Sequence, residues 1–172
     1  MKTVFVVGTK DSGKTTVAEF LVKSLSDRGY KVGTIKHIHH EFTMDTEGKD
    51  TYRMREAGSQ KVVSFSPNEI AIIRAPGDVQ KEFEGMAKEM EAEGFDFLVV
   101  EGFKMILDKV PRQFVFLTCR TTVELDGFLE RRRDDIDAIT GVVGEGLGTD
   151  YKGVPVESFP ARAGQLVEML LR

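Results

Sequence analysis

Apolar and polar positions follow two rhythms along this chain. Short runs rich in β-branched and aromatic residues, the pattern of strands, occur at 4–7, 32–35, 62–65, 70–73, 97–100, 114–117 and, more weakly, 138–143. Between them, apolar residues spaced three or four apart predict amphipathic helices over 16–25, 49–57, 79–90 and 160–171. This alternation predicts an α/β fold in three layers, with a mainly parallel sheet flanked by helices.

Two details refine the predicted sheet. The runs 97–100 and 114–117 are continuously apolar, as expected of central strands that are buried on both faces. The runs 62–65 and 70–73 are separated by the turn residues Ser66-Pro67-Asn68, which favours an antiparallel hairpin insert. No long linker or fixed repeat divides the chain, so we expect a single domain over 1–172.

A glycine-rich segment follows the first apolar run. Gly8-Thr9-Lys10-Asp11-Ser12-Gly13-Lys14-Thr15 has the spacing G-x-x-x-x-G-K-[ST] of a phosphate-binding P-loop, placed between a predicted strand and a predicted helix. There, backbone N–H groups and the helix N-terminus can face a phosphate chain. We expect Lys14 to reach the β- and γ-phosphates and the Thr15 hydroxyl to bind Mg²⁺. The motif therefore predicts nucleotide binding over its whole length, Asp11 and Ser12 included.

Acidic side chains near the expected carboxyl edge of the sheet are candidates for the Mg²⁺ site. Glu101 comes directly after the apolar run 97–100, and Lys104 follows it closely as a nearby cation. Ligands of open parallel sheets gather at this edge. The polar segment 36–48, which leaves the second strand, emerges at the same edge and contains Asp45, a candidate for binding Mg²⁺ or positioning a water.

The same polar segment holds all three histidines of the chain. His37 and His39 share one face if the segment is extended, a spacing that suits a transition metal, but the imidazoles could equally bind phosphate, a partner or water. The next helix carries Lys49 and Arg53 at i, i+4, a repulsive spacing that an anionic ligand would relieve. A local Asp50–Arg53 pair is the purely structural alternative.

Composition narrows the class of protein. The 172 residues carry a net charge of −4, which argues against a broad nucleic-acid surface or general attraction to anionic membranes. The single cysteine, Cys119, excludes an internal disulfide and fits a reducing compartment. The apolar runs are too short to cross a bilayer and the start of the chain lacks a signal-peptide pattern, so we expect a cytoplasmic protein.

The glycine-rich stretch 141–148 matches no phosphate-binding fingerprint, and we interpret it as a mobile loop. No guanine-reading Asn/Thr-Lys-x-Asp motif follows a late strand, because the only asparagine is Asn68. The residues alone leave GTP and ATP open.

Several motifs together resemble the MobB family, whose members are molybdopterin-guanine dinucleotide biosynthesis proteins. The matching pieces are the loop 8–16, Lys36-His37-x-His39-His40, the run Phe42-x-x-Asp45-x-x-Gly48-Lys49-Asp50-x-x-Arg53-x-x-x-Ala57-Gly58, and Glu101-Gly102-Phe103-Lys104. They cover residues 1 to about 104; beyond that point the resemblance is only architectural.

The resemblance implies a homodimeric GTP-binding protein with weak Mg²⁺-dependent GTPase activity. Such a protein would assist the molybdenum cofactor guanylyltransferase, which attaches GMP to molybdopterin to give its guanine dinucleotide form. Carried over to this sequence, phosphate and Mg²⁺ contacts would come from Gly13, Lys14, Thr15 and Thr16, with Asp45 and Glu101 as the acidic candidates. The neighbouring surface, for the pterin phosphate or the partner, would be formed by His37, His39, Lys49, Asp50 and Arg53.

Our leading hypothesis is thus a GTPase or GTP-binding adaptor in which Lys14 binds phosphate, Thr15 and Glu101 hold Mg²⁺, and Asp45 orients water or metal. Catalysis would rest on positioning and electrostatics. Two alternatives remain. One is a small-molecule kinase that holds an anionic acceptor with Lys49, Arg53 and Lys104. The other is a non-catalytic module in which the nucleotide orders 36–48 for a partner.

Overall fold

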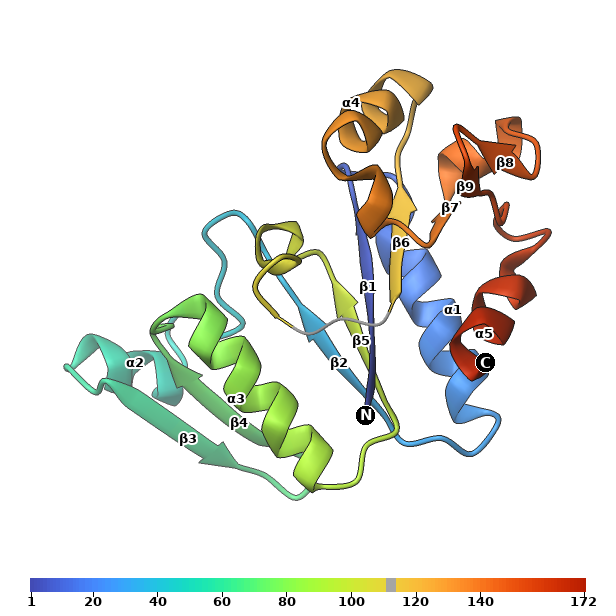
Figure 1. Cartoon of the computed structure of the whole chain (residues 1–172). Coiled ribbons are helices and arrows are strands. Elements are labelled where there is room, and N and C mark those ends of the chain that lie inside the picture. Colours follow the sequence, from blue (N-terminus) through green and yellow to red (C-terminus); the bar gives the residue numbers. More distant parts are fainter. Residues whose placement is uncertain (111–113) are drawn as a thin grey trace. The chain divides into compact units, whose positions relative to one another are not determined.

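The computed structural model describes residues 1–110 and 114–172 (Figure 1). The chain divides into two compact units, and we describe each by itself. Residues Met1–His37 and Glu84–Arg172 form the first, which we call the sheet unit, and Ile38–Phe83 form the second, the hairpin unit.

The sheet unit contains five parallel strands in the order β2-β5-β1-β6-β7. Their bounds are β1 Lys2–Gly8, β2 Val32–Lys36, β5 Phe97–Glu101, β6 Phe114–Thr118 and β7 Ala138–Thr140. Because the strands are parallel, all five carboxyl ends lie at one edge of the sheet. The predicted α/β class with a mainly parallel sheet is confirmed.

Helices with one apolar face cover this sheet. The α-helices within the described residues are α1 Lys14–Ser26, α2 Asp50–Glu56, α3 Val79–Ala92, α4 Thr122–Arg132 and α5 Ala163–Leu171. α1 and α5 contact each other and share a core with β1, β5 and β6 (Figure 1). α1 buries Val17, Ala18, Leu21 and Leu25, the stripe that its periodicity predicts. At β2 the packing is close, because a Cβ at Gly33 would lie 2.7 Å from the Met90 sulfur of α3.

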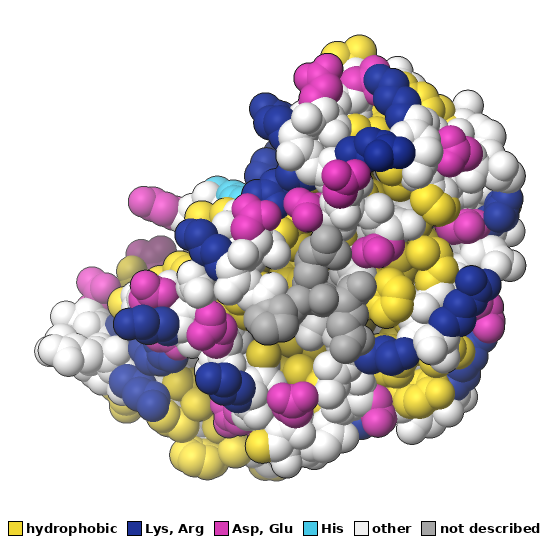
Figure 2. Space-filling model, in the orientation of Figure 1, with side chains coloured by type: hydrophobic (Ala, Val, Ile, Leu, Met, Phe, Trp, Pro, Cys, Tyr) yellow, Lys and Arg dark blue, Asp and Glu magenta, His cyan; other side chains and the backbone are white. Residues whose placement is uncertain are grey.

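The hairpin unit contains the predicted antiparallel hairpin. β3 (Lys61–Phe65) pairs with β4 (Ile70–Arg74), and α2 contacts β3. Within Ile38–Phe83 only Asp45, Val62 and Phe83 are buried. Apolar side chains reach the surface over β3 and β4, at the lower left of Figure 2. A two-stranded sheet that buries so few apolar side chains depends on further contacts for its stability.

The structure corrects two predictions near the C-terminus. The weak strand predicted for 138–143 ends at Thr140, and the stretch 141–148, predicted to be a mobile loop, begins with a 3-10 helix, Val142–Gly146. Hydrogen bonds fix it: the Val142 N–H lies 3.3 Å from the Ser12 carbonyl oxygen, and the Val143 N–H 3.1 Å from that of Cys119. Gly141, at φ 73°, makes the sharp turn that these contacts need.

Short elements complete the chain. They are 3-10 helices at Lys104–Ile106 and Arg133–Asp135 and the two-stranded sheet of β8 (Asp150–Tyr151) and β9 (Val154–Pro155). Among residues 1–110 and 114–172, no helix combines the length and the apolar character needed to span a bilayer.

Candidate functional site

The glycine-rich loop lies at the carboxyl edge of the sheet, between β1 and α1. Gly8 has φ 152°, and a Cβ there would lie 1.7 Å from the Thr118 carbonyl oxygen of β6, so only glycine fits. Ser12 is buried below the loop, where its Oγ lies 2.8 Å from the Thr9 carbonyl oxygen and 2.6 Å from Thr118 Oγ1. Gly13, at φ 91°, precedes the first turn of α1. The contacts of Gly8 and Ser12 with Thr118 therefore hold the loop against the end of β6.

Lys14 folds back over its own loop, where its ammonium donates to the Thr9 carbonyl oxygen. Burial lowers the pKa of Lys14, and the carboxylates of Glu101 and Asp11 partly offset this effect. Thr16, in the first turn of α1, is exposed, and Asp11 is exposed at φ 57°. The loop thus gathers backbone N–H groups, a helix N-terminus and a half-buried ammonium, which together favour an anion.

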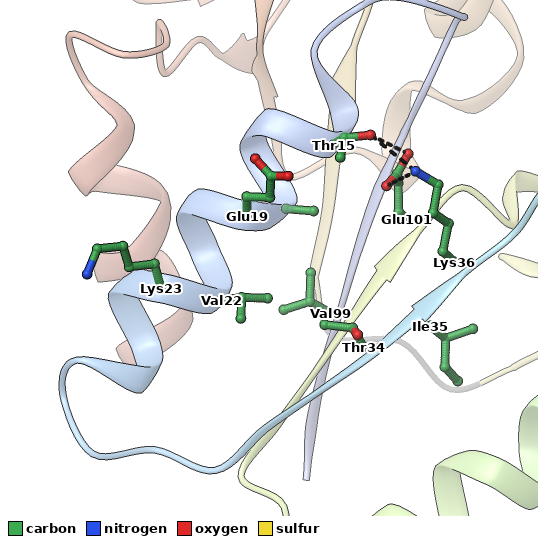
Figure 3. Close-up of a pocket in the computed structure, with 10 residues that line it drawn as sticks. Thr15, Glu19, Val22, Lys23, Thr34, Ile35, Lys36, Val99 and Glu101 are labelled. Carbon is green, nitrogen blue, oxygen red and sulfur yellow. Dashed lines mark hydrogen bonds and ion pairs between the residues drawn. The ribbon is translucent and has the colours of Figure 1, made fainter. Parts of the chain in front are cut away.

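Three side chains from three elements meet beside the loop (Figure 3). Thr15 Oγ1 of α1 donates to Glu101 Oε1 of β5 at 2.9 Å. The ammonium of Lys36, the last residue of β2, lies 3.1 Å from Glu101 Oε2 and 3.4 Å from Thr15 Oγ1. The side chain of Glu101 is 13% exposed and that of Lys36 is 53% exposed. The structure therefore brings Thr15 and Glu101 together as the sequence predicted and adds a cation between them.

This donor set fits Mg²⁺. A hydroxyl and a carboxylate are the hard oxygen ligands that Mg²⁺ takes, with its remaining positions filled by phosphate oxygens and water. The Lys36 ammonium lies within 3.4 Å of both oxygen groups. In the described part of the chain, no three His, Cys, Asp or Glu side chains form a metal-binding group by themselves.

The first predicted histidine has a packing role at this edge. The His37 ring lies 4.3 Å from the Phe103 ring, centroid to centroid, and the His37 backbone N–H donates to the Glu101 carbonyl oxygen at 2.9 Å. Gly102, at φ 88°, lets the chain turn directly after Glu101. These contacts join the ends of β2 and β5 and so help to hold the Glu101 carboxylate in place. Lys104 follows, exposed, at the start of its 3-10 helix.

Asp45 lies in the hairpin unit, where it has structural partners. Its side chain is 2% exposed and accepts hydrogen bonds from Thr51 Oγ1 at 2.7 Å and Arg55 Nη1 at 3.3 Å. Arg53 Nη1 lies 3.8 Å from Asp50, which is the local pair that we weighed as an alternative to an anion site. Lys49, His39 and His40 are exposed. The proposed action of Asp45 on water or metal stays a prediction.

The sequence analysis did not identify Lys36 as a site residue. It also did not identify Glu124, whose carboxylate accepts a hydrogen bond from the P-loop. Thr9 Oγ1 donates to Glu124 Oε2 at 2.7 Å. Arg120 side-chain and backbone donors and Thr9 lower the pKa of Glu124 to about 2. A signal was present, because Thr121-x-x-Glu124 is the spacing of a helix-capping pair, and Thr121 Oγ1 accepts from the Glu124 N–H. Lys36 could be found only from its place at the carboxyl end of a strand.

A cavity of about 380 Å³ opens beside the Thr15–Glu101 contact, between α1 and β2 (Figure 3). Its lining is Thr15, Ala18, Glu19, Val22, Lys23, Thr34, Ile35, Lys36, Val99 and Glu101. The volume is in the range of small-molecule pockets. Thr15, Lys36 and Glu101 make one end of it polar, while aliphatic side chains form much of the remainder.

The profile of the family described as Molybdopterin guanine dinucleotide synthesis protein B, MobB, matches residues 3–135. The chain belongs to the MobB family. This confirms the resemblance, and it carries the family match past residue 104, where our motifs ended. A molybdopterin-guanine dinucleotide biosynthesis adapter protein of Haemophilus influenzae is 39% identical over 100 residues, which are 58% of this chain and 55% of that protein. The adapter of Escherichia coli is 35% identical over 94 residues, 54% of each protein. The chain thus spans about half the length of the curated MobB relatives it matches.

Solved structures agree on the fold. The crystal structure of Bacillus subtilis MobB matches with a TM-score of 0.73 and 24% identity over 98% of both chains. A MobB homologue from Bacillus stearothermophilus matches with a TM-score of 0.67 and 18% identity over the whole of both chains. At these identities the likeness concerns the fold, and it supports the arrangement of sheet and helices described above.

Proposed function

We propose that this chain is a GTP-binding adaptor with weak Mg²⁺-dependent GTPase activity that assists formation of the guanine dinucleotide form of the molybdenum cofactor. The observation that carries the proposal is the contact of Thr15 with Glu101 at the end of an intact P-loop. Family membership supplies the pathway, and the relatives named adapter proteins supply the role. The molybdenum cofactor guanylyltransferase is the proposed partner, and molybdopterin or its dinucleotide form the proposed cargo.

Different groups of the protein bind the phosphate chain, hold Mg²⁺ and orient water. Backbone N–H groups of the loop and the Lys14 ammonium bind the phosphate chain, and Thr15 and Glu101 hold Mg²⁺, which neutralises phosphate charge when bound. Little covalent chemistry is left for the protein, so the rate depends on how well a water is oriented. Asp45, which Thr51 and Arg55 hold within the hairpin unit, remains the predicted candidate for that orientation.

Nucleotide affinity tests the proposal. We expect Lys14→Ala to weaken GTP binding in Mg²⁺ by about a hundredfold or more, because it removes a charge-assisted contact to phosphate. Lys23→Ala is the matched control, since Lys23 is exposed and pairs with Asp27 at 2.8 Å further along α1. Competition between GTP and ATP, measured with a fluorescent analogue, gives the base preference. Equal affinities of wild type and Lys14→Ala would refute the site.

The apolar face of the hairpin supports the proposed homodimer. Val63 lies opposite Ile72 and Phe65 opposite Ile70, and these four side chains are between 42% and 76% exposed. A contiguous apolar face of this kind indicates an interaction site. In a two-fold dimer the same patch meets itself, so these four apolar side chains would pack against their own copies, with Lys61 and Arg74 at one end of the face. We therefore propose that a second copy of this chain covers the hairpin.

The cavity beside Thr15 and Glu101 favours one further candidate, a small-molecule kinase whose acceptor occupies it. Phosphate release in the absence of any acceptor supports the GTPase, whereas transfer only to an added acceptor supports the kinase. A non-catalytic adaptor would leave GTP intact for many hours and still change the protease sensitivity of 36–48. One time course of GTP, with and without acceptors, separates the three.

A further inference from the structure

Lys36 is a charged partner of the proposed Mg²⁺ ligands for which the sequence motifs supplied no role. Its ammonium lies 3.1 Å from Glu101 Oε2 and 3.4 Å from Thr15 Oγ1, the two groups that would hold the metal. It is also near enough to Lys14 to help lower the pKa of that residue. A positive charge thus already lies against the oxygen atoms that Mg²⁺ would use.

The position of Lys36 follows from the fold. Lys36 is paired with Glu101 in the register of β2 and β5, and both residues end their strands at the same edge of the sheet. The His37 backbone N–H then donates to the Glu101 carbonyl oxygen, which holds the end of β2 in place. The Lys36 side chain is half exposed, so its ammonium can leave without breaking the core. A flexible stem with one compact charge is well suited to exchange with a metal ion.

We propose that Lys36 is a tethered cation that occupies the Mg²⁺ position of the nucleotide-free protein and so sets the Mg²⁺ concentration at which the nucleotide site fills. The inference rests on the proposed nucleotide site and adds a residue that tunes it. The ammonium satisfies the Glu101 carboxylate, which would otherwise face incoming phosphate as an uncompensated like charge. The divalent ion must displace the ammonium, and this competition weakens its apparent affinity.

The decisive variant is Lys36→Met, which keeps the aliphatic stem and removes the charge. We expect the Mg²⁺ concentration that gives half-maximal binding of a fluorescent GTP analogue to fall by about three- to tenfold, the effect of one unit charge a few ångströms away in a wet site. Lys23→Met is the matched control. It removes the same charge from another residue of the same cavity, and we expect a change of less than about twofold, because screening weakens distant exposed charges.

A second pair of variants separates competition from a merely structural ion pair. Lys36→Arg keeps the charge, so its half-saturating Mg²⁺ stays near the wild-type value. In a Glu101→Gln background the contact has lost its carboxylate, so adding Lys36→Met changes little. An effect of Lys36→Met that persists at full size in Glu101→Gln would overturn the proposal, as would an unchanged or raised half-saturating concentration in Lys36→Met alone. Circular dichroism confirms that each variant is folded.

Mn²⁺ binding to the nucleotide-free protein, followed by electron paramagnetic resonance, gives a readout that needs no nucleotide. We expect Lys36→Met to bind Mn²⁺ at least about threefold more tightly than wild type and Lys23→Met. Failure of wild type to bind any nucleotide would refute the proposed function, and the Mn²⁺ titration would still decide the role of Lys36. Equal Mn²⁺ affinity in all the proteins, or binding by none of them, would refute the tethered cation.

Discussion

The two units of the chain treat their apolar residues in opposite ways. The sheet unit buries a continuous core of β1, β5, β6, α1 and α5. The hairpin unit, Ile38–Phe83, buries only two apolar residues and exposes many large ones: Phe42, Met44, Met54, Val63, Phe65, Ile70, Ile72 and Val79. Burial of apolar surface is the main source of stability. The buried core therefore accounts for the stability of the sheet unit. The exposed apolar side chains of the hairpin unit are expected to pack against another surface.

The two units also differ in how they hold the acidic side chains that were predicted to belong to the site. In the sheet unit, Glu101 is held by Thr15 and Lys36, two groups that a metal ion could replace or join. In the hairpin unit, Asp45 is enclosed by Thr51 and Arg55. A partly open, exchangeable pair is typical of a binding site, whereas an enclosed one is typical of local structure. Changes made in matched pairs, one in each unit, test how far this contrast extends.

The largest effect is expected from glycine substitutions. Gly8→Ala would place a Cβ 1.7 Å from the Thr118 carbonyl oxygen, so the loop must move away from β6. We expect a loss of about 3 kcal/mol or more in the free energy of unfolding, together with loss of nucleotide binding. Gly48→Ala in the hairpin unit has nothing within 4 Å and only an unfavourable φ of 81°, so about 1 kcal/mol is expected. Urea titrations measure both.

Hydrogen exchange distinguishes the two glycine variants further. Gly8→Ala lowers protection throughout the sheet unit, whereas Gly48→Ala affects residues near it in the hairpin unit. Equal losses in the two variants would mean that the close approach of β1 to β6 adds nothing beyond backbone strain.

A charge on the hairpin face gives the next largest effect. Ile72→Glu places a carboxylate in the middle of the apolar face, and we expect the dimer dissociation constant to rise by about a hundredfold, near 3 kcal/mol. Val123→Glu is the control, because Val123 is an apolar residue, 80% exposed, on α4 of the sheet unit and outside the hairpin. Sedimentation equilibrium measures both. A wild-type monomer at all concentrations, or equal dissociation constants in the two variants, would refute the proposed interface.

Asp45→Asn tests the second contrast. It keeps the shape but weakens the contacts with Thr51 and Arg55, so we expect the hairpin unit to lose about 1–3 kcal/mol of local stability. Hydrogen exchange of α2 reports this loss, while GTP affinity is expected to stay within about threefold. Asp50→Asn is the control, because Asp50 is 90% exposed and lies 3.8 Å from Arg53; less than about 0.5 kcal/mol is expected.

The GTPase rate of Asp45→Asn decides between structure and chemistry. A rate that falls far more than the protection of α2 supports the predicted water-orienting role. A rate that falls only in step with local unfolding shows that the carboxylate acts as an anchor.

Much of the fold follows from local sequence patterns. The run 97–100 predicts a central strand because all four side chains must be buried, and the position after it places Glu101 at the carboxyl edge. The P-loop is equally local, since its spacing is set by the turn that it makes. The antiparallel hairpin follows from its two apolar runs and the turn residues between them.

Contacts between distant residues were beyond the same reasoning. Thr9 meets Glu124 across 115 positions, and Ser12 meets Thr118 across 106, so no window of the sequence contains either pair. The stretch 141–148 shows the consequence. Its glycine content predicts mobility, but hydrogen bonds to Ser12 and Cys119 hold its first residues in a 3-10 helix. Local composition describes what a segment can do alone, and distant partners decide what it does in the fold.

The smallest change in stability is expected from lowering the pH. Both units contain a glutamate whose pKa is lowered chiefly by a hydrogen bond from an arginine side chain: Glu124, to about 2, beside the P-loop, and Glu82 in the hairpin unit. A lowered pKa contributes stability above the value of the unfolded chain, near 4.5, and this contribution is lost as the pH falls through the folded value. The ionised Glu124 carboxylate should therefore stabilise the folded protein at neutral pH. This stabilisation should be lost as the pH falls from about 4.5 to about 2.

Glu124→Gln and Glu82→Gln are the matched pair. We expect Glu124→Gln to lower the urea midpoint at pH 6 and the gap from wild type to narrow as the pH is lowered toward 3. Glu124 accepts from Thr9 and from the Arg120 N–H as well as from the Arg120 side chain, so its gap should persist in 0.5 M salt. Glu82 accepts one backbone hydrogen bond, from the Gly77 N–H at 3.3 Å, and otherwise depends on the Arg74 side chain, so more of its effect comes from an ion pair that salt screens and its gap should shrink more. Equal salt dependence in the two variants would show that the contact with Thr9 adds nothing to the arginine pair and that the P-loop is held from β6 alone.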